Sequence, residues 1–412
     1  MSAPAGERVG FLDVLRMPEI RAVVVVTFVI MLGFGILSPA LPLYAQSFGV
    51  SRGAVGLLIS AFAIMRLIFD LVAGGLVDRY GERSMATLGA GIVGVSSALA
   101  AMAPTFPLLV VFRGAGGAGS SIFFASLMAY LLRTAPRDRV GRVMGVFYGA
   151  FNLGIIAGQP VGGLAARYLG LASPLWIYAG ACLLSAALYL RAIHPQGDRP
   201  ARDPSVPRGL RSLPRTRQFA TVLVVGLAYA WMIGAVFSTL IPLFGRERVG
   251  LTEVGVGLSL AVVSASEFAV LFHAGSLADR RGRRAVMLPA FGLLCASVAV
   301  IGLATSLPWF LAVMVVLGVA AGYAGVAPTA MLADVAPSRS SGTAIGAYRF
   351  MTDVGFVLGP LVAGVTADLA GFGAAFAVSA GPSLVAVLML LSIPETMRRA
   401  PPDGPASTDP GR

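Results

Sequence analysis

Long apolar stretches alternate with short polar ones along almost the whole chain. Twelve of the apolar stretches are each long enough to cross a hydrocarbon core about 30 Å thick as a helix, which takes about 20 residues. They cover residues 22–45, 54–77, 85–104, 107–132, 143–167, 173–191, 219–244, 254–277, 285–305, 308–333, 343–367 and 373–393. The pattern predicts an all-α, multi-spanning membrane protein with twelve transmembrane helices.

The chain also repeats itself at a constant spacing of 201 residues. No insertion or deletion interrupts this register, so two copies of one unit predict two similarly built six-helix bundles with an interface between them. We expect the bundles at residues 1–194 and 219–394, a cytoplasmic linker at 195–218 and a disordered cytoplasmic tail at 395–412. The matched positions are Gly56, Gly74, Asp78, Arg79, Gly81, Pro107, Pro136, Gly141, Gly145, Gly154, Gly158 and Gly163 with Gly257, Gly275, Asp279, Arg280, Gly282, Pro308, Pro337, Gly342, Gly346, Gly355, Gly359 and Gly364.

Composition agrees with a membrane protein and orients it. Hydrophobic residues make up 57% of the chain and charged residues 12%, against about 25% charged residues in a soluble domain. All 31 basic residues are arginine, and most of them fall on the side that carries the termini. The positive-inside rule therefore predicts a multi-pass protein of the cell membrane with both termini in the cytoplasm. The outer ends carry only Arg52, Arg167, Arg246 and Arg248.

Several kinds of chemistry are absent from the sequence. The formal charge of +12 is explained by a basic cytoplasmic face, without a nucleic acid partner. The chain has no lysine, hence no P-loop, and its only histidines are His194 and His273, so neither a metal site nor a catalytic triad is expected. We predict a protein that is not an enzyme, has no cofactor and acts as a monomer.

Two loops carry the same charged motif. Residues 74–83 read GGLVDRYGER and residues 275–284 read GSLADRRGRR. Both resemble the G-x-x-x-D-R-x-G-R-R motif of the major facilitator superfamily, with Glu82 as a departure in the first copy. The resemblance implies a conformational latch, since in that family the acids approach the starts of helices 11 and 5, here near Gly342 and Gly141, when the cytoplasmic side is closed. The latch would consist of Gly74, Asp78, Arg79, Gly275, Asp279 and Arg280.

A second resemblance concerns spans 5 and 11. The glycines there are similar to the antiporter motif of drug exporters in this superfamily, G-(x)8-G-(x)3-G-P-x-x-G-G. Small residues let helices approach closely and proline permits a bend, so we expect this ridge to pack helices of opposite halves against each other. The proline stands one place late in the first copy. The motif residues are Gly145, Gly154, Gly158 and Pro160 in span 5, and Gly346, Gly355, Gly359 and Pro360 in span 11.

Arg113 and its following glycines in span 4 look like a further family motif. An arginine inside the bilayer is unfavourable unless it is paired or faces a water-filled cavity. Both a structural pair and a role toward substrate or proton remain open. The resemblance implies a central cavity lined by spans 1, 4, 7 and 10. Further candidates for cavity or substrate contacts are Asn152, Gln159, His273 and Tyr348. For His273 a packing role or a modest modulating role is the favoured interpretation.

Glu267 lies within span 8, with no basic residue three or four positions away on its own helix. Burial favours the neutral form of a carboxylic acid, so we expect Glu267 to be protonatable at working pH. Its expected neighbour on span 5 is Asn152. The acid would carry the transported proton or contact a cationic substrate; a structural hydrogen bond is the alternative.

Four more charges are placed as two pairs on spans 2 and 11. Arg66 and Asp70 are four residues apart, as are Arg349 and Asp353, so each pair lies on one helix face. The superfamily architecture places these two antiparallel helices side by side. Opposite charges then meet at matching depths, Asp70 with Arg349 and Arg66 with Asp353. The alternative is that each pair is satisfied within its own helix.

Together these features predict a secondary transporter that works by alternating access. The resemblance implies proton-coupled export of a small amphipathic or hydrophobic compound. Span 1 lacks the acid that many drug exporters of the superfamily carry there. A uniporter or importer of an organic solute and a lipid or lysolipid transporter are the alternatives. The expected partners are a small-molecule substrate, protons and membrane lipids.

Overall fold

The computed structural model describes residues 17–136, 139–192, 213–304, 306–336 and 341–397. Within these ranges all regular secondary structure is helical. The residues from 195 to 212 and beyond 397, which include most of the expected linker and tail, lie outside the described part of the chain. The elements are α2 (Pro18–Gln46), α3 (Arg52–Tyr80), α4 (Glu82–Ala101), α5 (Phe106–Thr134), α6 (Val140–Leu169), α7 (Ser173–Ala192), α8 (Arg217–Trp231), the π-helix η2 (Met232–Leu240), α9 (Ile241–Glu247), α10 (Glu253–Arg281), α11 (Arg283–Ile301), α12 (Leu307–Val335) and α13 (Ser341–Leu391).

These elements form twelve membrane crossings, as the sequence predicted. The segments α8, η2 and α9 run on continuously as one span, Arg217–Glu247. The apolar part of α13 covers 49 residues, about 74 Å at the helical rise, which is long enough to cross the hydrocarbon core twice. It is divided at Gly371, whose φ of 81° and ψ of 175° are not helical. Large apolar side chains such as Leu71 and Leu369 are 78% and 83% exposed on the helix surfaces, as expected of groups that would face lipid.

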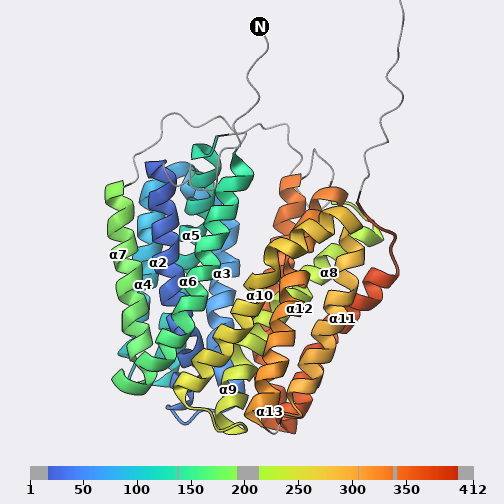
Figure 1. Cartoon of the computed structure of the whole chain (residues 1–412). Coiled ribbons are helices and arrows are strands. Elements are labelled where there is room, and N and C mark those ends of the chain that lie inside the picture. Colours follow the sequence, from blue (N-terminus) through green and yellow to red (C-terminus); the bar gives the residue numbers. More distant parts are fainter. Residues whose placement is uncertain (1–16, 137–138, 193–212, 305, 337–340, 398–412) are drawn as a thin grey trace, which may run out of the picture.

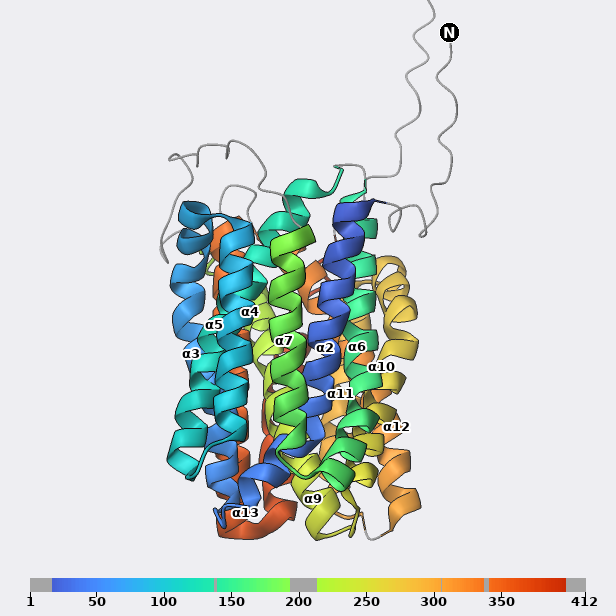
Figure 2. The same cartoon turned by 90° about the vertical axis from the view of Figure 1, so that its left-hand side faces the viewer.

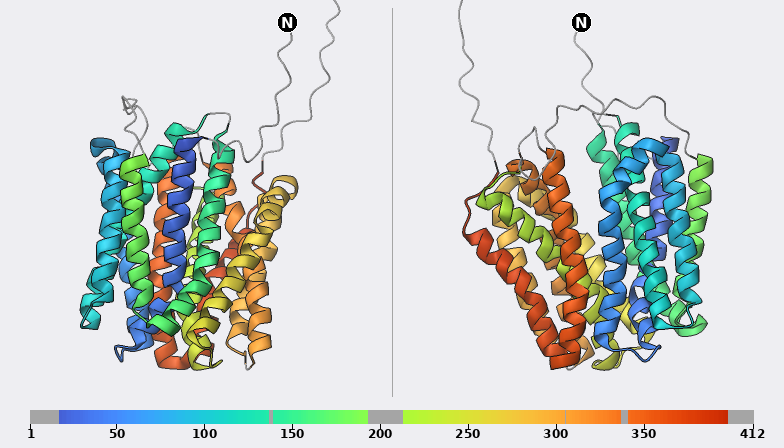
Figure 3. Two further views of the ribbon diagram at one scale, coloured as in Figure 1. Left: turned by 60° about the vertical axis from the view of Figure 1, so that its left-hand side comes forward. Right: turned by 180° about the vertical axis from the view of Figure 1, so that it is seen from behind.

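The helices are arranged as two bundles, α2–α7 and α8–α13 (Figure 1). Figure 2 shows the first bundle from outside, with the second behind it. Helix α3 packs against α13 and helix α6 against α10 across the interface between the bundles. The ribbons of the two bundles diverge toward the face at which α2 begins and converge toward the other face (Figures 1 and 3). These are called the terminal face and the opposite face below.

The 201-residue repeat is visible in the turns. All six glycines with positive φ among the described residues form three pairs at this spacing, one of them the predicted pair Gly81 and Gly282. Their φ values are 89° and 108°, in the left-handed half of φ space that side chains rarely adopt. The other pairs are Gly49 with Gly250 and Gly170 with Gly371. The same sharp turns therefore end the same helices in both bundles.

Glu82, the departure from the family motif, has a structural explanation. Its carboxylate forms an ion pair with Arg133 at the end of α5. The positions 201 residues later are Arg283 and Asp334, and they form the equivalent pair with the charges exchanged, Nε to Oδ2 at 3.0 Å. In each bundle an ion pair thus joins the start of one helix to the end of the next, α4 to α5 and α11 to α12. The pair forms whichever helix carries the acid.

The segment after α13 is bound to the rest of its bundle. The tail was expected to begin at residue 395, yet the Glu395 carboxylate accepts hydrogen bonds from the backbone N–H groups of Arg283, Arg284 and Ala285. These are orphan donors at the start of α11. Burial alone would raise the pKa of Glu395, but the backbone donors outweigh it and the pKa is lowered. Residues 395–397 therefore belong to the folded bundle, since the carboxylate caps a helix.

Candidate functional site

A cavity of about 640 Å³ lies between the two bundles. The first bundle contributes residues mainly of α2, α3, α5 and α6, and the second residues of α8, η2, α10 and α13. Most of the lining is apolar or aromatic, including Phe34, Phe124, Phe151 and Phe237. A concave, mostly apolar site with a few placed polar groups is the usual form of a small-molecule site.

Contacts of the glycines show which end of the interface is closed. Near the opposite face, a Cβ added to Gly56 of α3 would overlap the carbonyl oxygen of Pro360 of α13, and one added to Gly257 of α10 would overlap that of Gln159 of α6. Toward the terminal face three of these helices, α3, α6 and α13, carry glycines whose added Cβ would meet nothing within 4 Å, namely Gly74, Gly75, Gly141, Gly145, Gly149 and Gly346. The bundles are therefore in contact at the opposite face and apart at the terminal face.

Polar contacts across the bundles reinforce the closed end. Arg52 at the start of α3 forms an ion pair with Glu247 of α9. The Asp368 carboxylate of α13 accepts hydrogen bonds from the backbone N–H of Arg52 and of Gly53, at 3.0 and 2.7 Å. On the other side of the interface Arg167 lies 3.6 Å from Glu253. We call Arg52, Arg167, Glu247, Glu253 and Asp368 the opposite-face gate.

The four charges of spans 2 and 11 meet across the α3–α13 interface and line the cavity. Arg66 donates to Asp353. Arg349 Nη2 lies 3.7 Å from Asp70 Oδ2. These are the cross-helix pairs that the antiparallel charge order predicted. We call these four residues the charge seam.

Each acid of the charge seam is more shielded from solvent than its arginine. The side chains of Asp353 and Asp70 are 7% and 19% exposed, against 31% for Arg66 and 48% for Arg349. Ser121 of α5 donates a further hydrogen bond to Asp70. Loss of either arginine would leave a shielded carboxylate without its cation, which is the unfavourable half of a broken buried pair.

Arg113 lies in the wall of the cavity and is 4% exposed. Its guanidinium stands over the ring of Phe62 at 4.2 Å and near that of Tyr178 at 5.9 Å. Among the described residues no carboxylate pairs with it, and Nε and Nη1 are buried without a hydrogen-bond acceptor. The structural pairing that the sequence left open is therefore not found in this part of the chain.

Glu267 also lines the cavity, on α10 of the second bundle. Its expected neighbour was Asn152, but the hydrogen bond that Glu267 accepts comes from Tyr229 Oη of α8, at 2.7 Å. Asn152 lines the cavity and donates to the carbonyl of Tyr148 on its own helix. The expectation of an Asn152 partner is thus wrong, because the Glu267 carboxylate is directed to α8 of its own bundle.

The remaining candidates divide between cavity and periphery. Gln159 lines the cavity and donates to Ser264 Oγ of α10 at 3.0 Å, which links the bundles at the closed end. His273 is exposed and contacts Tyr323 Oη of α12 at 2.7 Å, outside the cavity lining. Tyr348 is also outside that lining and packs at Gly226 of α8. The expectation that His273 and Tyr348 face the cavity is not met, because both are turned toward neighbouring helices of their own bundle.

The chain matches the model of the Major Facilitator Superfamily at residues 23–272 and 249–410. It belongs to this superfamily. It is 24% identical to the quinolone resistance protein NorA of Staphylococcus aureus over 369 residues, 88% of this chain and 93% of NorA. Multidrug resistance protein 1 of Bacillus subtilis is 25% identical over 355 residues, 83% and 88% of the two chains. The crystal structure of the human organic anion transporter MFSD10 shares the fold, with a TM-score of 0.68 and 20% identity, over 90% of this chain and 99% of that one.

The glycine ridge typical of exporters in this superfamily serves mainly contacts within one bundle. An added Cβ on Gly154 or Gly158 of α6 would meet the backbone of α2, and one on Gly355 or Gly359 of α13 would meet the backbone of the α8–η2 span. Only the last glycine of each ridge crosses the interface, Gly163 toward Glu253 being one of them. The expectation that the ridge joins opposite halves is therefore correct only at its end, because glycines four residues apart share a face and that face is turned to the same bundle.

The two latch aspartates of the superfamily motif are exposed near the terminal face. The Asp279 side chain is 71% exposed and its ion pair is with Arg283 of the next helix, at 3.1 Å. Gly141, at the start of α6, has no atom within 4 Å of an added Cβ. In this conformation Asp279 is therefore paired within its own bundle.

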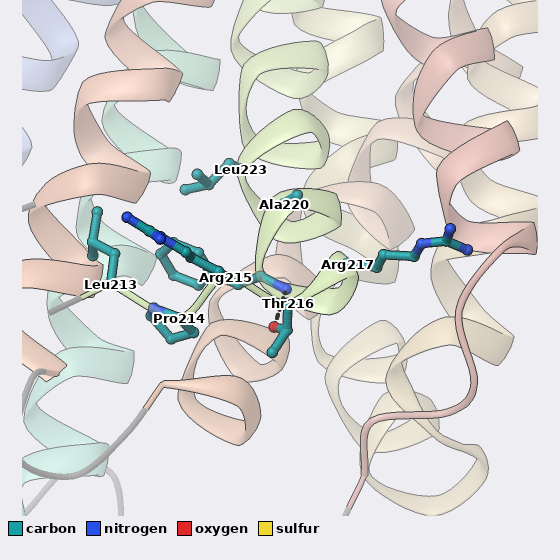
Figure 4. Close-up of a pocket in the computed structure, with 8 residues that line it drawn as sticks. Leu213, Pro214, Arg215, Thr216, Arg217, Ala220 and Leu223 are labelled. Atoms are coloured by element: carbon teal, nitrogen blue, oxygen red, sulfur yellow. Dashed lines mark hydrogen bonds between the residues drawn. The ribbon is translucent and has the colours of Figure 1, made fainter. Parts of the chain in front are cut away.

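A second, shallower pocket of about 420 Å³ surrounds the start of α8 (Figure 4). Thr216 caps the helix there by accepting a hydrogen bond from the backbone N–H of Phe219 at 3.2 Å. Arg215 and Arg217 flank the cap (Figure 4). The pocket lies away from the interface between the bundles and holds none of the site residues named above.

Sequence reasoning did not identify the opposite-face gate or Tyr229. A signal for the gate exists in the repeat, since Gln46 and Glu247 are 201 residues apart and form a hydrogen bond of 2.6 Å. Residues related by the repeat touch only where the pseudo-twofold axis passes. Tyr229 has no comparable signal.

Replacing Gly56 with alanine should reduce the population of the conformation described here. The added Cβ would overlap the Pro360 carbonyl oxygen, and overpacking of this kind costs about 1–3 kcal/mol. Gly91→Ala on α4, a helix that packs against α3, α5 and α7 of its own bundle, adds the same group where nothing lies within 4 Å, so it is the matched control. Spin-label distances between α3 and α13 at the terminal face would measure the shift. Identical distance distributions for the two variants would contradict this assignment of the closed end.

Proposed function

We propose that this superfamily member is a proton-coupled exporter of small amphipathic compounds that works by alternating access. The supporting observation is the cavity between two repeat-related bundles, closed at one face and lined by ion pairs that cross the interface. Two relatives are named for drug resistance, one for quinolones and one for several drugs. We place the terminal face in the cytoplasm of a cell-membrane protein, in accordance with the arginine distribution. It acts as a monomer.

The charge seam is the proposed coupling device. A proton taken up by Asp70 or Asp353 neutralises the acid and releases its arginine on the facing helix, so α3 and α13 can separate. Loss of the proton restores the pair and draws the helices together. Because the pairs join the two bundles, protonation of either acid changes the relative free energies of the two conformations.

Transport by purified protein in liposomes tests this proposal. A pH-sensitive dye inside the liposomes reports proton movement, and a panel of amphipathic compounds supplies the substrate. A coupled exporter moves substrate against protons, and an uncoupler abolishes the accumulation. Substrate movement that an uncoupler leaves unchanged would indicate a uniporter, and movement of labelled phospholipid alone would indicate a lipid transporter; either result contradicts the proposal.

Neutralising a latch acid should favour the conformation that is open at the terminal face. A carboxylate at a helix N-terminus contributes about 0.3–1 kcal/mol when exposed and up to about 2 kcal/mol when partly buried. Asp78→Asn or Asp279→Asn removes this contribution only from the closed conformation. Labelling rates of a cysteine placed on the cavity side near the terminal face should rise. Glu19→Gln, an exposed acid in the first turn of α2, is the control. Labelling that is as slow as in the control would refute the latch.

A further inference from the structure

The charged side chains that line the cavity are equal in number for the two signs, but not all of them are paired. Six of them line it, three arginines and three acids: Arg66, Arg113, Arg349, Asp70, Glu267 and Asp353. The charge seam uses four of these and pairs them with each other. Within the described part of the chain the remaining two, Arg113 and Glu267, form no ion pair with any residue. One unpaired cation and one unpaired acid thus face the same space.

The surroundings of Arg113 are incomplete without a further group. Its guanidinium is almost wholly removed from solvent, and two of its three nitrogens, Nε and Nη1, have no acceptor among the described residues. The rings of Phe62 and Tyr178 supply an electron-rich surface, which compensates a cation only in part. Arginine presents its donors as a planar fork that matches a carboxylate or phosphate group. An anionic group entering the cavity would supply the missing acceptors.

Glu267 offers the complementary group on the other bundle. Its Oε1 accepts one hydrogen bond, from Tyr229, which holds the carboxylate in the cavity wall without neutralising it. Counted from the ends of α5 and α10 at the opposite face, Arg113 lies about 10 Å and Glu267 about 21 Å along its helix. The cation is therefore nearer the closed end and the acid nearer the open end. Aromatic side chains such as Phe34, Phe151 and Phe237 line the same cavity.

We propose that the substrate is a zwitterion with an apolar body, whose anionic group binds Arg113 and whose cationic group binds Glu267. This inference rests on the proposed transport function and specifies its substrate class. A neutral or singly charged compound would leave at least one of the two side chains without a counter-charge in a largely dehydrated site. A zwitterion satisfies both, and it contacts both bundles at once. A cationic group bound beside Glu267 stabilises the charged form of the acid, so the substrate itself supplies the counter-charge that Glu267 lacks.

Binding of three probes with one scaffold tests the proposal. The zwitterion is 4′-(aminomethyl)biphenyl-4-carboxylic acid, and biphenyl-4-carboxylic acid and 4-(aminomethyl)biphenyl each carry one of its charges. Calorimetric titration of the full-length protein in lipid nanodiscs, without any proton gradient, gives the dissociation constants. We expect the zwitterion to bind at least about tenfold more tightly than either single-charge probe, since a charge-assisted hydrogen bond contributes that much or more. A zwitterion that binds no better than the others, or not at all, overturns the assignment.

Two variants assign the ends of the probe. Arg113→Gln should weaken the zwitterion about tenfold to the level of the amine probe and leave the amine probe unchanged. Glu267→Gln, which keeps a group able to bond Tyr229, should do the reverse. Ser38→Ala, an uncharged change in the same cavity lining, should preserve the order of the three probes. A variant that weakens all three probes equally has only a structural effect, and a Glu267→Gln protein with an unchanged order would show that Glu267 does not bind the amine; both results refute the proposal.

The zwitterion site and the exporter function are distinguished by different results. Binding in the expected order without transport in liposomes would remove the exporter function and keep the site. Proton-driven transport of uncharged compounds by a protein whose probe order shows no charge preference would keep the exporter and remove the zwitterion. Gel filtration of each variant confirms that it is folded, and the wild-type order alone decides the proposal if a variant does not fold.

Discussion

Exchanging the charges of Asp70 and Arg349 is expected to restore transport that either single change abolishes. Each single change puts two like charges face to face between α3 and α13, where the acids are largely shielded from solvent. Removing one partner of a buried pair is destabilising by about 3–5 kcal/mol, and the exposed part of Arg349 reduces this figure. A loss of at least tenfold in the initial transport rate is therefore expected for Asp70→Arg and for Arg349→Asp.

The double exchange separates the cross-helix pairs from pairs within one helix. In the doubly exchanged protein α3 carries two arginines and α13 two aspartates, so the pairs across the interface are still complementary. Pairs within a helix would instead become like-charged at four residues apart, which is unfavourable. We expect the double variant to recover a clear part of the proton-driven transport in liposomes. Recovery no better than either single variant would contradict the cross-helix seam.

A control distinguishes the ion pairs from the hydrogen bond that supports them. Ser121→Ala removes the hydroxyl that donates to Asp70 and leaves all four charges in place. Its expected effect is that of one hydrogen bond to a charged group, about 1.5–3 kcal/mol at most, and no charge exchange should rescue it. The initial transport rate in liposomes should therefore fall by less than in Asp70→Arg. A loss as large as that of Asp70→Arg would show that the charges are not what distinguishes the seam.

Removing carboxylates from the opposite-face gate is expected to open that face. The combined variant Glu247→Gln with Asp368→Asn loses the ion pair to Arg52 and weakens the capping of α3. The side chains of Arg52 and Glu247 are 31% and 24% exposed, so each contact contributes about 1 kcal/mol or less. Two conformations that differ by a few kcal/mol respond to such a sum, and the population open at the opposite face should rise about tenfold.

Spin labels or cysteine labels on both bundles at the opposite face would measure this shift. Asp334→Asn is a matched control, because its ion pair with Arg283 joins two helices of the same bundle and does not cross the interface. The control should alter stability and not the distribution of distances. If the gate variant and the control give the same distribution, the gate contacts do not hold the opposite face closed.

Much of this protein was accessible from local features of the sequence. The apolar lengths define the spans because a bilayer offers no partner for an unpaired backbone. The 201-residue register carries the fold of one bundle over to the other, including the loop glycine that ends α3 and α10 alike. The pairs Asp70–Arg349 and Arg66–Asp353 were predictable from depth. The depth of a residue along a helix follows from the residue count, and two antiparallel helices bring residues of equal depth together.

Only the tertiary structure decided the direction in which each helix turns its polar face. Glu267 bonds Tyr229 and not Asn152, and Gly154 and Gly158 pack on α2 and not across the interface. The rotation of a helix about its own axis cannot be predicted from its hydrophobicity, because lipid and the protein interior are equally apolar. Small residues also allow several packings of the same helix. The open end likewise follows from the balance of two conformations a few kcal/mol apart. That balance is a sum over many contacts, so a single sequence compatible with both conformations does not reveal it.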